Sequence, residues 1–377
     1  MSSPHHLLPT VEGIVTASQL QATVDAIASI QVADGNIPWT PGGHTDPWNL
    51  VEAAMALDLG GRHEEARAAY RWLAGRQRAD GGWHAYYLGD EVEDPTLDTN
   101  VTCYVATGAW HHHLVTGDTQ YLREQWPTVE AAIDFALDFQ RETGEIAWRG
   151  DDPDDGALLT GSSSIHHSVK CALAIAERLG YERPDWELSL GGLAIAIAHR
   201  PDVFLDKDRW AMDWYYPILG GVLRGSAAAA RVAARWTTFV VEGRGVRCVS
   251  DRPWVTAAET CELVMALDAL GADDEARRLF AWVQFLRAAG GGYWTGANFE
   301  DERFDEDGEL FPAEQPSWNS AAVVLAANAL AGTGPTAGLF RGERLPEGLS
   351  AAALLAAGVE LERERAARRS SGVIPLP

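Results

Sequence analysis

The chain has few basic residues for its size. Thirty Lys and Arg residues face 54 Asp and Glu residues in 377 positions, a formal net charge of −24. Nucleic acids and anionic membrane surfaces are bound through basic patches, so this balance argues against both as partners. No apolar run approaches the ~20 residues that a membrane-spanning helix needs. We therefore expect a protein with no transmembrane segment that acts on a small-molecule substrate.

Cysteine is scarce as well. The four cysteines lie far apart and form no C-x-x-C pair, which argues against a disulfide framework or a zinc ribbon. The first residues, MSSPHHLLPTVEG, lack the basic start and apolar run of a signal peptide. Reduced thiols in a cytoplasmic protein are the simplest expectation. The cysteines are Cys103, Cys171, Cys248 and Cys261.

Strand signals are also poor, and a helical pattern recurs instead. In LAGRQRADGGW (Leu73 to Trp83) an apolar helix ends near a Gln, a Gly-bearing turn follows, and a Trp closes the turn. We interpret the Gln as a cap on open helix-end groups and the Trp as an apolar seal. A degenerate fifth copy runs from Trp236 to Trp254. The four clear copies are centred on Gln31, Gln77, Gln140 and Gln284.

A second helix, rich in small residues, follows each turn. Amphipathic helices precede them, as in Glu64 to Gln77 and Asp273 to Arg287. The weakest unit has an outer helix over Asp185 to Arg200 but no Gln–Gly–Trp turn. Six such hairpins predict an all-α fold, an (α/α)6 toroid over residues 20–333, after a lead-in (1–19) and before a C-terminal helix and disordered tail (334–377). The expected inner-helix starts are Asp46, Asp98, Ser162, Asp213, Thr256 and Ser317.

The repeats carry a family resemblance. Leu73, Gln77, Gly81 and Trp83 have the spacing of the repeat in the terpenoid cyclase and protein prenyltransferase superfamily, and the copy from Phe280 to Trp294 has a longer spacer. The chain resembles that superfamily over about residues 20 to 333. The resemblance implies an isoprenoid-handling enzyme with carbocation chemistry in a central pocket. In hairpin count and in the stretch TGSSSIHHSVKCALAIAERLG the chain is also similar to six-hairpin glycosidases.

An acidic D-x-D-D motif lies at Asp152, Asp154 and Asp155. The resemblance to class II terpene cyclases implies that Asp154 is a proton donor whose pKa is raised by its acidic neighbours. Gly156 and a further loop separate the motif from the next helix, unlike the family pattern, so a solvated acidic turn is the alternative. No His follows His199. A zinc-dependent prenyltransferase lacks its third ligand here, and no metal or cofactor is expected.

The inner helices of a toroid all begin at one mouth, so residues at their starts should line a common pocket. Catalytic acids are expected there at Glu259, Asp213 and Asp98. Each Asp could instead serve only as a helix cap. Glu259, with Glu262 one turn later, lies inside its helix, so capping does not explain it. The expected substrate contacts are Asp46, Trp48, Asn100, His166, Trp214, Tyr215 and Trp318.

Two chemistries remain open for this pocket. The resemblance favours the isoprenoid enzyme, in which aromatic side chains shield a carbocation. The alternative is a carbohydrate-active enzyme in which two carboxylates, such as Asp213 and Glu259, act as acid and base while Trp side chains stack on sugar rings. A toroid that only binds a ligand or a partner is a third possibility, and the clustered acids argue against it. The oligomeric state is left open.

Two further segments carry structural expectations. The acidic stretch from Asp301 to Pro316 is expected to form a lid over the mouth. Three consecutive histidines, His111 to His113, end the second inner helix. Successive helical residues point ~100° apart, so three in a row do not chelate one metal. We interpret them as structural groups at a helix C-terminus.

Overall fold

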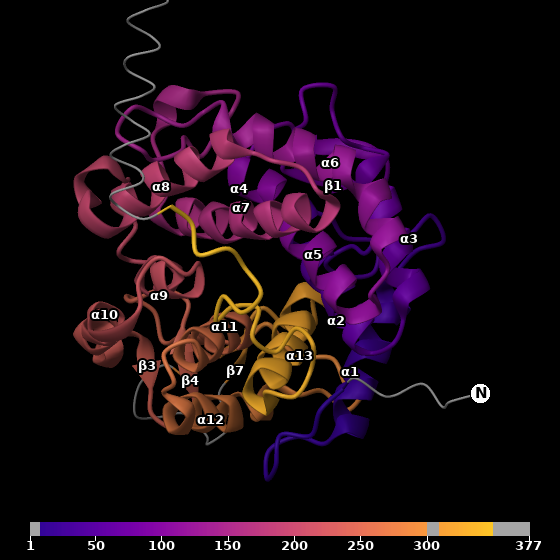
Figure 1. Cartoon of the computed structure of the whole chain (residues 1–377). Helices are drawn as coiled ribbons and strands as arrows, with labels where there is room; N and C mark the ends of the chain where they lie inside the picture. Colours follow the sequence, from indigo (N-terminus) through magenta and orange to yellow (C-terminus); the bar gives the residue numbers. More distant parts are fainter. Residues whose placement is uncertain (1–7, 300–308, 350–377) are drawn as a thin grey trace, which may run out of the picture.

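Thirteen α-helices form two concentric rings in the computed structural model, which describes residues 8–299 and 309–349. Each ring has six positions, and one inner position is occupied by two consecutive short helices. Each inner helix contacts the next, and the last contacts the first, so the inner ring is closed (Figure 1). The predicted all-α (α/α)6 toroid is confirmed. The inner ring is built from α2 (Pro47–Leu59), α4 (Thr99–Cys103) with α5 (Val105–Thr116), α7 (Leu159–Leu179), α9 (Ala211–Leu219), α11 (Ala257–Asp268) and α13 (Ser317–Ala331).

The outer helices surround this ring and face solvent on one side (Figure 1). In α3, only a stripe of residues at helical spacing is buried, including Ala66, Tyr70 and Leu73. In α2, by contrast, every residue except Trp48 is buried. The apolar stripe explains why the outer helices have an amphipathic sequence and the inner ones do not. The outer ring is α1 (Ala17–Ile30), α3 (His63–Ala74), α6 (Thr119–Leu137), α8 (Pro184–His199), α10 (Gly225–Phe239) and α12 (Asp273–Trp282).

Short strands join the helices. A hairpin of β1 (Tyr86–Leu88) and β2 (Glu91–Asp94) precedes α4. A five-stranded antiparallel sheet follows chain order, and its strands of two or three residues are too short to leave an alternating sequence pattern. β5 leads directly into α11, which places Glu259 beside the sheet. The sheet contains β3 (Val240–Val241), β4 (Gly245–Arg247), β5 (Trp254–Thr256), β6 (Gly296–Asn298) and β7 (Glu309–Leu310). Three 3-10 turns, η1 (Pro153–Asp155), η2 (Pro201–Val203) and η3 (Val283–Leu286), complete the elements.

Two of the predicted helix starts are true N-caps. Asp46 and Asp98 accept hydrogen bonds from the backbone N–H groups of Asn49 and Val101, both at 2.9 Å. α7 begins earlier than predicted, at Leu159, so Ser162 lies inside the helix. α9 likewise begins at Ala211, and Asp213 stands in its first turn rather than at its cap.

In three of the four clear turns the Gln joins neighbouring outer helices, which corrects its interpretation as a cap there. Gln77 donates through Nε2 to the carbonyl of Gly81 at 2.9 Å and to that of Thr128, in α6, at 2.9 Å. Gln31 and Gln140 make the same pair of bonds, to α3 and α8 respectively. Only Gln284 caps its own helix, by donating to a carbonyl of α12.

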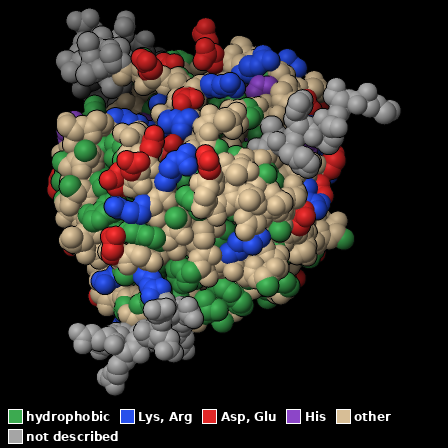
Figure 2. Space-filling model, turned by 90° about the horizontal axis from the view of Figure 1, so that it is seen from below, with side chains coloured by type: hydrophobic (Ala, Val, Ile, Leu, Met, Phe, Trp, Pro, Cys, Tyr) green, Lys and Arg blue, Asp and Glu red, His purple; other side chains and the backbone are tan. Residues whose placement is uncertain are grey.

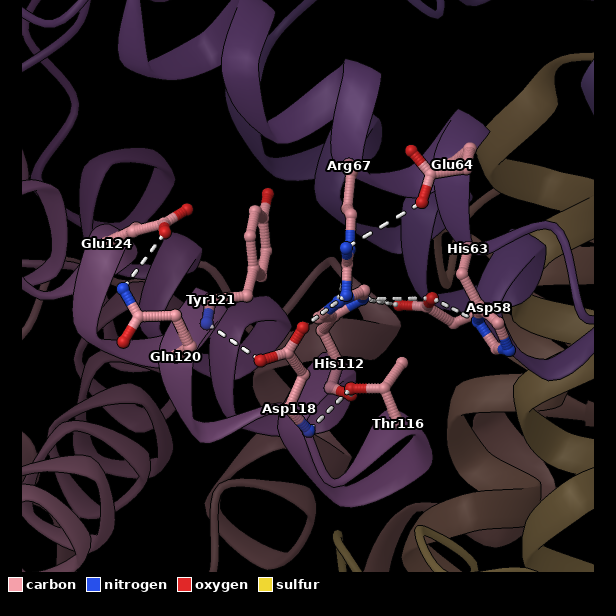
Figure 3. Close-up of polar contacts among 10 residues, drawn as sticks. All are labelled: Asp58, His63, Glu64, Arg67, His112, Thr116, Asp118, Gln120, Tyr121 and Glu124. Atoms are coloured by element: carbon pink, nitrogen blue, oxygen red, sulfur yellow. Dashed lines mark hydrogen bonds and ion pairs between the residues drawn. The ribbon is translucent and has the colours of Figure 1, made fainter.

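The histidine run lies at the C-terminal ends of the inner helices (Figure 3). Arg67 donates to Nε2 of His112 at 3.3 Å, so the other ring nitrogen, Nδ1, donates to the buried Asp58 at 2.9 Å. Arg67 also binds Asp118 at 2.7 Å. These bonds tie the ends of α2, α3, α5 and α6 together. Among the described residues, no group of three His, Cys, Asp or Glu side chains is arranged to hold a metal ion.

The sequence-based expectations on charge, membrane helices and cysteines can also be compared with the structure. On the face drawn in Figure 2, the described acidic and basic side chains are interspersed. Within residues 8–299 and 309–349, no helix is both long enough and apolar enough to cross a bilayer. All four cysteines are buried and none is in a disulfide. Half of the expected acidic lid, residues 301–308, and residues 350–377 of the expected C-terminal helix and tail (334–377) lie outside the described residues.

Candidate active site

A cavity of about 390 Å³ opens at the end of the ring where the inner helices begin. Residues at or near the starts of five inner helices line it, so the ring gathers side chains that are far apart in the sequence. We call it the central cavity. Its walls include Trp39, Asp46, Trp48, Asn49, Glu52, Tyr86, Asp94, Asp98, Trp148, Met212, Glu259, Glu262 and Trp318.

Three carboxyl groups come from three different helix starts. Asp46 is buried and held on both oxygens: Trp39 donates from its indole at 2.6 Å, and the side chain and backbone of Asn49 donate at 2.7 and 2.9 Å. Burial raises the pKa of Asp46, and these hydrogen bonds oppose the rise. Its geometry is therefore fixed before any ligand binds.

Asp98 has a freer carboxyl group. Its Oδ1 accepts the backbone N–H of Val101. Burial raises its pKa to about 6; backbone hydrogen bonds from Val101 and Asn100 oppose that rise, and the nearby charge of Asp46 adds to it. A carboxyl group of this kind holds its proton up to about pH 6, well above the usual range of an Asp, and is able to donate it.

Glu259, in the first turn of α11, is the third acid. The hydroxyl of Thr256 donates to its Oε2. The Cys248 thiol also bonds this carboxyl group, and the side chain of Glu259 lines the central cavity. Glu259 and Asp98 come from helices that are not neighbours in the ring.

Two further acids form the floor of the central cavity. The hydroxyls of Tyr215 and Tyr216 both donate to Glu262, and that of Tyr104 donates to Glu52 at 3.3 Å. Burial raises the pKa of Glu262 to about 8 despite the two tyrosines, and burial together with the Glu262 charge raises that of Glu52. Near neutral pH Glu262 therefore holds its proton. Glu52 shows no sequence signal, because it lies in the middle of a uniformly buried helix.

Aromatic side chains form much of the wall. The ring of Trp39 lies 5.4 Å from Trp318 and 5.9 Å from Tyr86, centroid to centroid. Trp39 and Trp148 close Gln–Gly–Trp turns and also line the central cavity, so their role goes beyond the predicted apolar seal. Trp83 does seal its turn: it is fully buried and its indole donates to the Leu73 carbonyl at 2.9 Å. The two kinds of Trp look alike in the sequence.

Comparison with known proteins decides the family. No family model matches the chain. It is 50% identical over 344 residues, covering 91% of this chain and 94% of the relative, to an MMP endo-(1,4)-3-O-methyl-alpha-D-mannosidase of Mycolicibacterium hassiacum. The chain belongs to this mannosidase family. It is a glycosidase, and the expectation of an isoprenoid enzyme of the terpenoid cyclase or prenyltransferase type is wrong.

Solved structures show the same fold at low identity. A wild-type glycosidase superimposes with a TM-score of 0.65 at 15% identity, covering 88% of this mannosidase-family chain and 99% of the other. A GH63 mannosylglycerate hydrolase from Thermus thermophilus, in complex with glucose, has a TM-score of 0.65 at 12% identity, covering 80% and 98%. The (α/α)6 toroid is thus a fold of glycosidases. The Gln–Gly–Trp repeat serves helix packing and not catalysis. For this reason its resemblance to the terpenoid cyclase repeat indicated the wrong enzyme class.

The D-x-D-D motif lies outside the central cavity, so its acids cannot protonate a substrate bound there. Asp152, Asp154 and Asp155 are all exposed, on and beside the turn η1, and do not line the central cavity. Arg149 pairs with Asp155 at 3.5 Å. Protonating an alkene needs an acid in a dry pocket, whereas these carboxylates are solvated. The motif is an acidic surface turn in this mannosidase-family protein.

The remaining expected site residues divide into two groups. Trp48, Asp46 and Trp318 line the central cavity. The others do not. Those on α7 and α9, helices that begin earlier than predicted, have other partners, and Asn100 of α4 faces a neighbouring pocket. Asp213 accepts from Thr160 and lines a separate cavity of about 450 Å³ with Trp214. His166 is bonded to the Gly220 carbonyl at 2.8 Å, Tyr215 supports Glu262, and Asn100 lines a small pocket beside Asp98.

Proposed function

We propose that this chain is an endo-acting glycosidase that hydrolyses α-1,4 linkages between 3-O-methyl-D-mannose units. The relative at 50% identity has this specificity in its name. The observation that carries the proposal is the pair of carboxyl groups, Asp98 and Glu259, at two inner-helix starts in one aromatic-walled cavity. Glycoside hydrolysis needs such a pair on either side of the scissile bond.

Asp98 is the proton donor in this scheme. Departure of the leaving sugar requires a proton on the glycosidic oxygen, which becomes O4 of that sugar. A carboxyl group with a pKa of about 6 carries that proton and has enough acidity to release it. The bond from Val101 holds one oxygen of Asp98 and leaves the other for the substrate.

Glu259 is the base. It takes a proton from a water molecule that attacks the anomeric carbon from the face opposite the leaving group. α4 and α11 are not neighbours in the ring, which favours the wide separation, roughly 6.5–9.5 Å, that leaves room for this water. Hydrolysis then inverts the anomeric configuration. Asp46, whose side chain is fixed by three hydrogen bonds, accepts a further hydrogen bond from a hydroxyl group of the sugar.

The first experiment uses α-1,4-linked 3-O-methylmannose oligosaccharides and follows their cleavage by mass spectrometry. Internal cleavage is expected, with the β anomer as the first product by NMR. Asp98→Asn and Glu259→Gln should each lower kcat by about 10²–10⁴-fold. Asp213→Asn is the matched comparison, because Asp213 stands at another helix start and outside the central cavity. Loss of activity in Asp213→Asn with Asp98→Asn unaffected would show that the acid is misassigned.

A further inference from the structure

A side pocket of about 80 Å³ opens beside Asp98 and shares Asp98 and Trp148 with the central cavity. Its remaining walls come from the start of α4, from the segment before α7 and from the start of α7 itself. The space exceeds the ~10–15 Å³ that one water molecule needs. It is therefore large enough for a small substituent of a bound sugar, and it lies next to the proposed proton donor.

The chemistry of the side pocket is mixed. Ile146, Leu158 and Ile165 supply apolar surface. Two buried polar atoms, Oγ of Ser162 and Oδ1 of Asn100, have no hydrogen-bond partner among the described residues. Ser162 is only 1% exposed. A buried hydroxyl without a partner costs free energy, so a ligand atom that accepts its proton is favoured there.

The covalent structure of the substrate would place the 3-O-methyl group beside this side pocket. In an α-1,4 linkage, the oxygen that Asp98 protonates is O4 of the leaving sugar. Carbon 3 is the ring neighbour of carbon 4, so the substituent on O3 of that sugar lies beside the protonated oxygen. A methyl ether at this position has an oxygen that accepts from Ser162 and a methyl group that is compatible with the isoleucines.

We propose that the side pocket binds the 3-O-methyl group of the leaving sugar and selects for methylated substrate. This inference rests on the proposed function. Ser162 donates to the ether oxygen, Ile146 and Ile165 contact the methyl group, and Asn100 accepts a bond from a neighbouring sugar hydroxyl. An unmethylated O3 would bring a hydroxyl against the apolar wall and leave the methyl's space unfilled.

Gly161 offers a direct way to close the side pocket. It lines the pocket in the first turn of α7. A Cβ atom added there would lie 3.5 Å from Cβ of Asn100 and 3.6 Å from Cβ of Leu158, which are ordinary contact distances. Gly161→Ala therefore occupies the space without a clash, and Ala is the better helix former.

The test compares two α-1,4 mannose oligosaccharides that differ only in methylation at position 3 of the leaving-side unit. The wild type is expected to prefer the methylated one. Gly161→Ala should lower kcat/KM on the methylated substrate by about 10- to 200-fold and lower it much less on the unmethylated substrate. Ser162→Ala should lower the same rate selectively. Gly192→Ala is the control, because a Cβ at that α8 position also meets ordinary contacts, 3.5 Å from Gln140 Nε2, away from the site.

The outcomes separate this inference from the proposed function. If the wild type cleaves the methylated oligosaccharide and Gly161→Ala keeps the same preference, the pocket assignment is wrong and the function stands. Equal wild-type rates on both substrates also overturn the assignment. If the wild type cleaves neither substrate, both proposals fall. Thermal unfolding shows whether Gly161→Ala is folded, so that a lost preference is not mistaken for lost structure.

Discussion

At Asp98, burial and hydrogen bonding act on the carboxyl group in opposite directions. Burial is the larger effect, and the pKa rises to about 6. Glu262, deeper in the same cavity, is raised to about 8 by the same cause. The central cavity thus has a graded set of acids: Glu262 stays largely protonated at neutral pH, while Asp98 is half ionised near pH 6. Such perturbed groups in a cleft are typical of catalytic sites.

This gradient predicts the pH dependence of hydrolysis. Asp98 acts in its protonated form, whose fraction falls as pH rises through about 6. We expect kcat/KM to fall about tenfold per pH unit above that value. In Asp98→Asn, a substrate whose leaving group needs no protonation should still react, without this alkaline limb. Initial rates from about pH 4.5 to 8.5 check both, and a limb near pH 6 that persists in Asp98→Asn would assign it to another group.

Among the elements, the Gly of each turn lets neighbouring outer helices approach closely. Gly81 has a φ of +95°, and a Cβ atom there would lie 2.2 Å from the Ala131 carbonyl of α6. Gly35 and Gly144 meet α3 and α8 in the same way. The Gln side chain then bonds both backbones. The repeat is therefore a connector between consecutive outer helices, and its recurrence follows from the recurrence of the hairpin.

Gln77→Ala tests this connector. The substitution leaves the carbonyls of Gly81 and Thr128 without their donor, so the free energy of unfolding should fall by about 1–3 kcal/mol. Gln120→Ala on α6 is the control, since Gln120 bonds only exposed partners such as Glu124, and it should change stability by less than about 0.5 kcal/mol. Urea unfolding measures both. Equal effects would show that the Gln bonds do not hold the helices.

At the scale of the whole molecule, the ring has a seam where the first helix meets the last hairpin. Thr23 of α1 is fully buried, and its hydroxyl donates to the Gly291 carbonyl at 2.8 Å. A Cβ atom at Gly291 would lie 2.5 Å from the Ala22 carbonyl. The turn before α13 therefore closes on α1 as the other turns close on their neighbours. The two ends of the toroid stabilise each other across the seam.

Thr23→Val is expected to weaken the contact between α1 and the last turn while the protein still unfolds in a single cooperative transition. Val has nearly the shape of Thr but cannot donate, so the unsatisfied Gly291 carbonyl should cost about 1–3 kcal/mol of unfolding free energy. Because the ring is closed, far-ultraviolet circular dichroism and Trp fluorescence should report one shared transition. Ser29→Ala, an exposed position on the same helix, should leave the midpoint unchanged. Two separate transitions in Thr23→Val would contradict a single cooperative ring.

Much of the architecture could be predicted from the sequence because it depends on local patterns. Apolar residues at helical spacing, Asp46 and Asp98 at N-cap positions, and the repeated Gln and Gly define six hairpins, and a ring is the arrangement that buries their inner helices. The starts of α7 and α9 were misplaced, because Leu158 and Trp210 precede these helices without a side-chain cap. Ser162 and Asp213 were therefore assigned to the wrong face.

Short-range periodicity is enough to predict the fold and a common mouth at the helix starts. Which acids meet at that mouth depends on the packing of the whole ring. Asp98 and Glu259 lie 161 positions apart by number, and Glu52 and Glu262 are brought together by ring closure rather than by any local pattern. The degree of burial is a property of the assembled ring. It raises the pKa of Asp98, whereas Asp154 lies on the surface and stays solvated. For this reason the repeat led to the wrong chemistry, while the geometry of the cavity and the related mannosidase lead to glycoside hydrolysis.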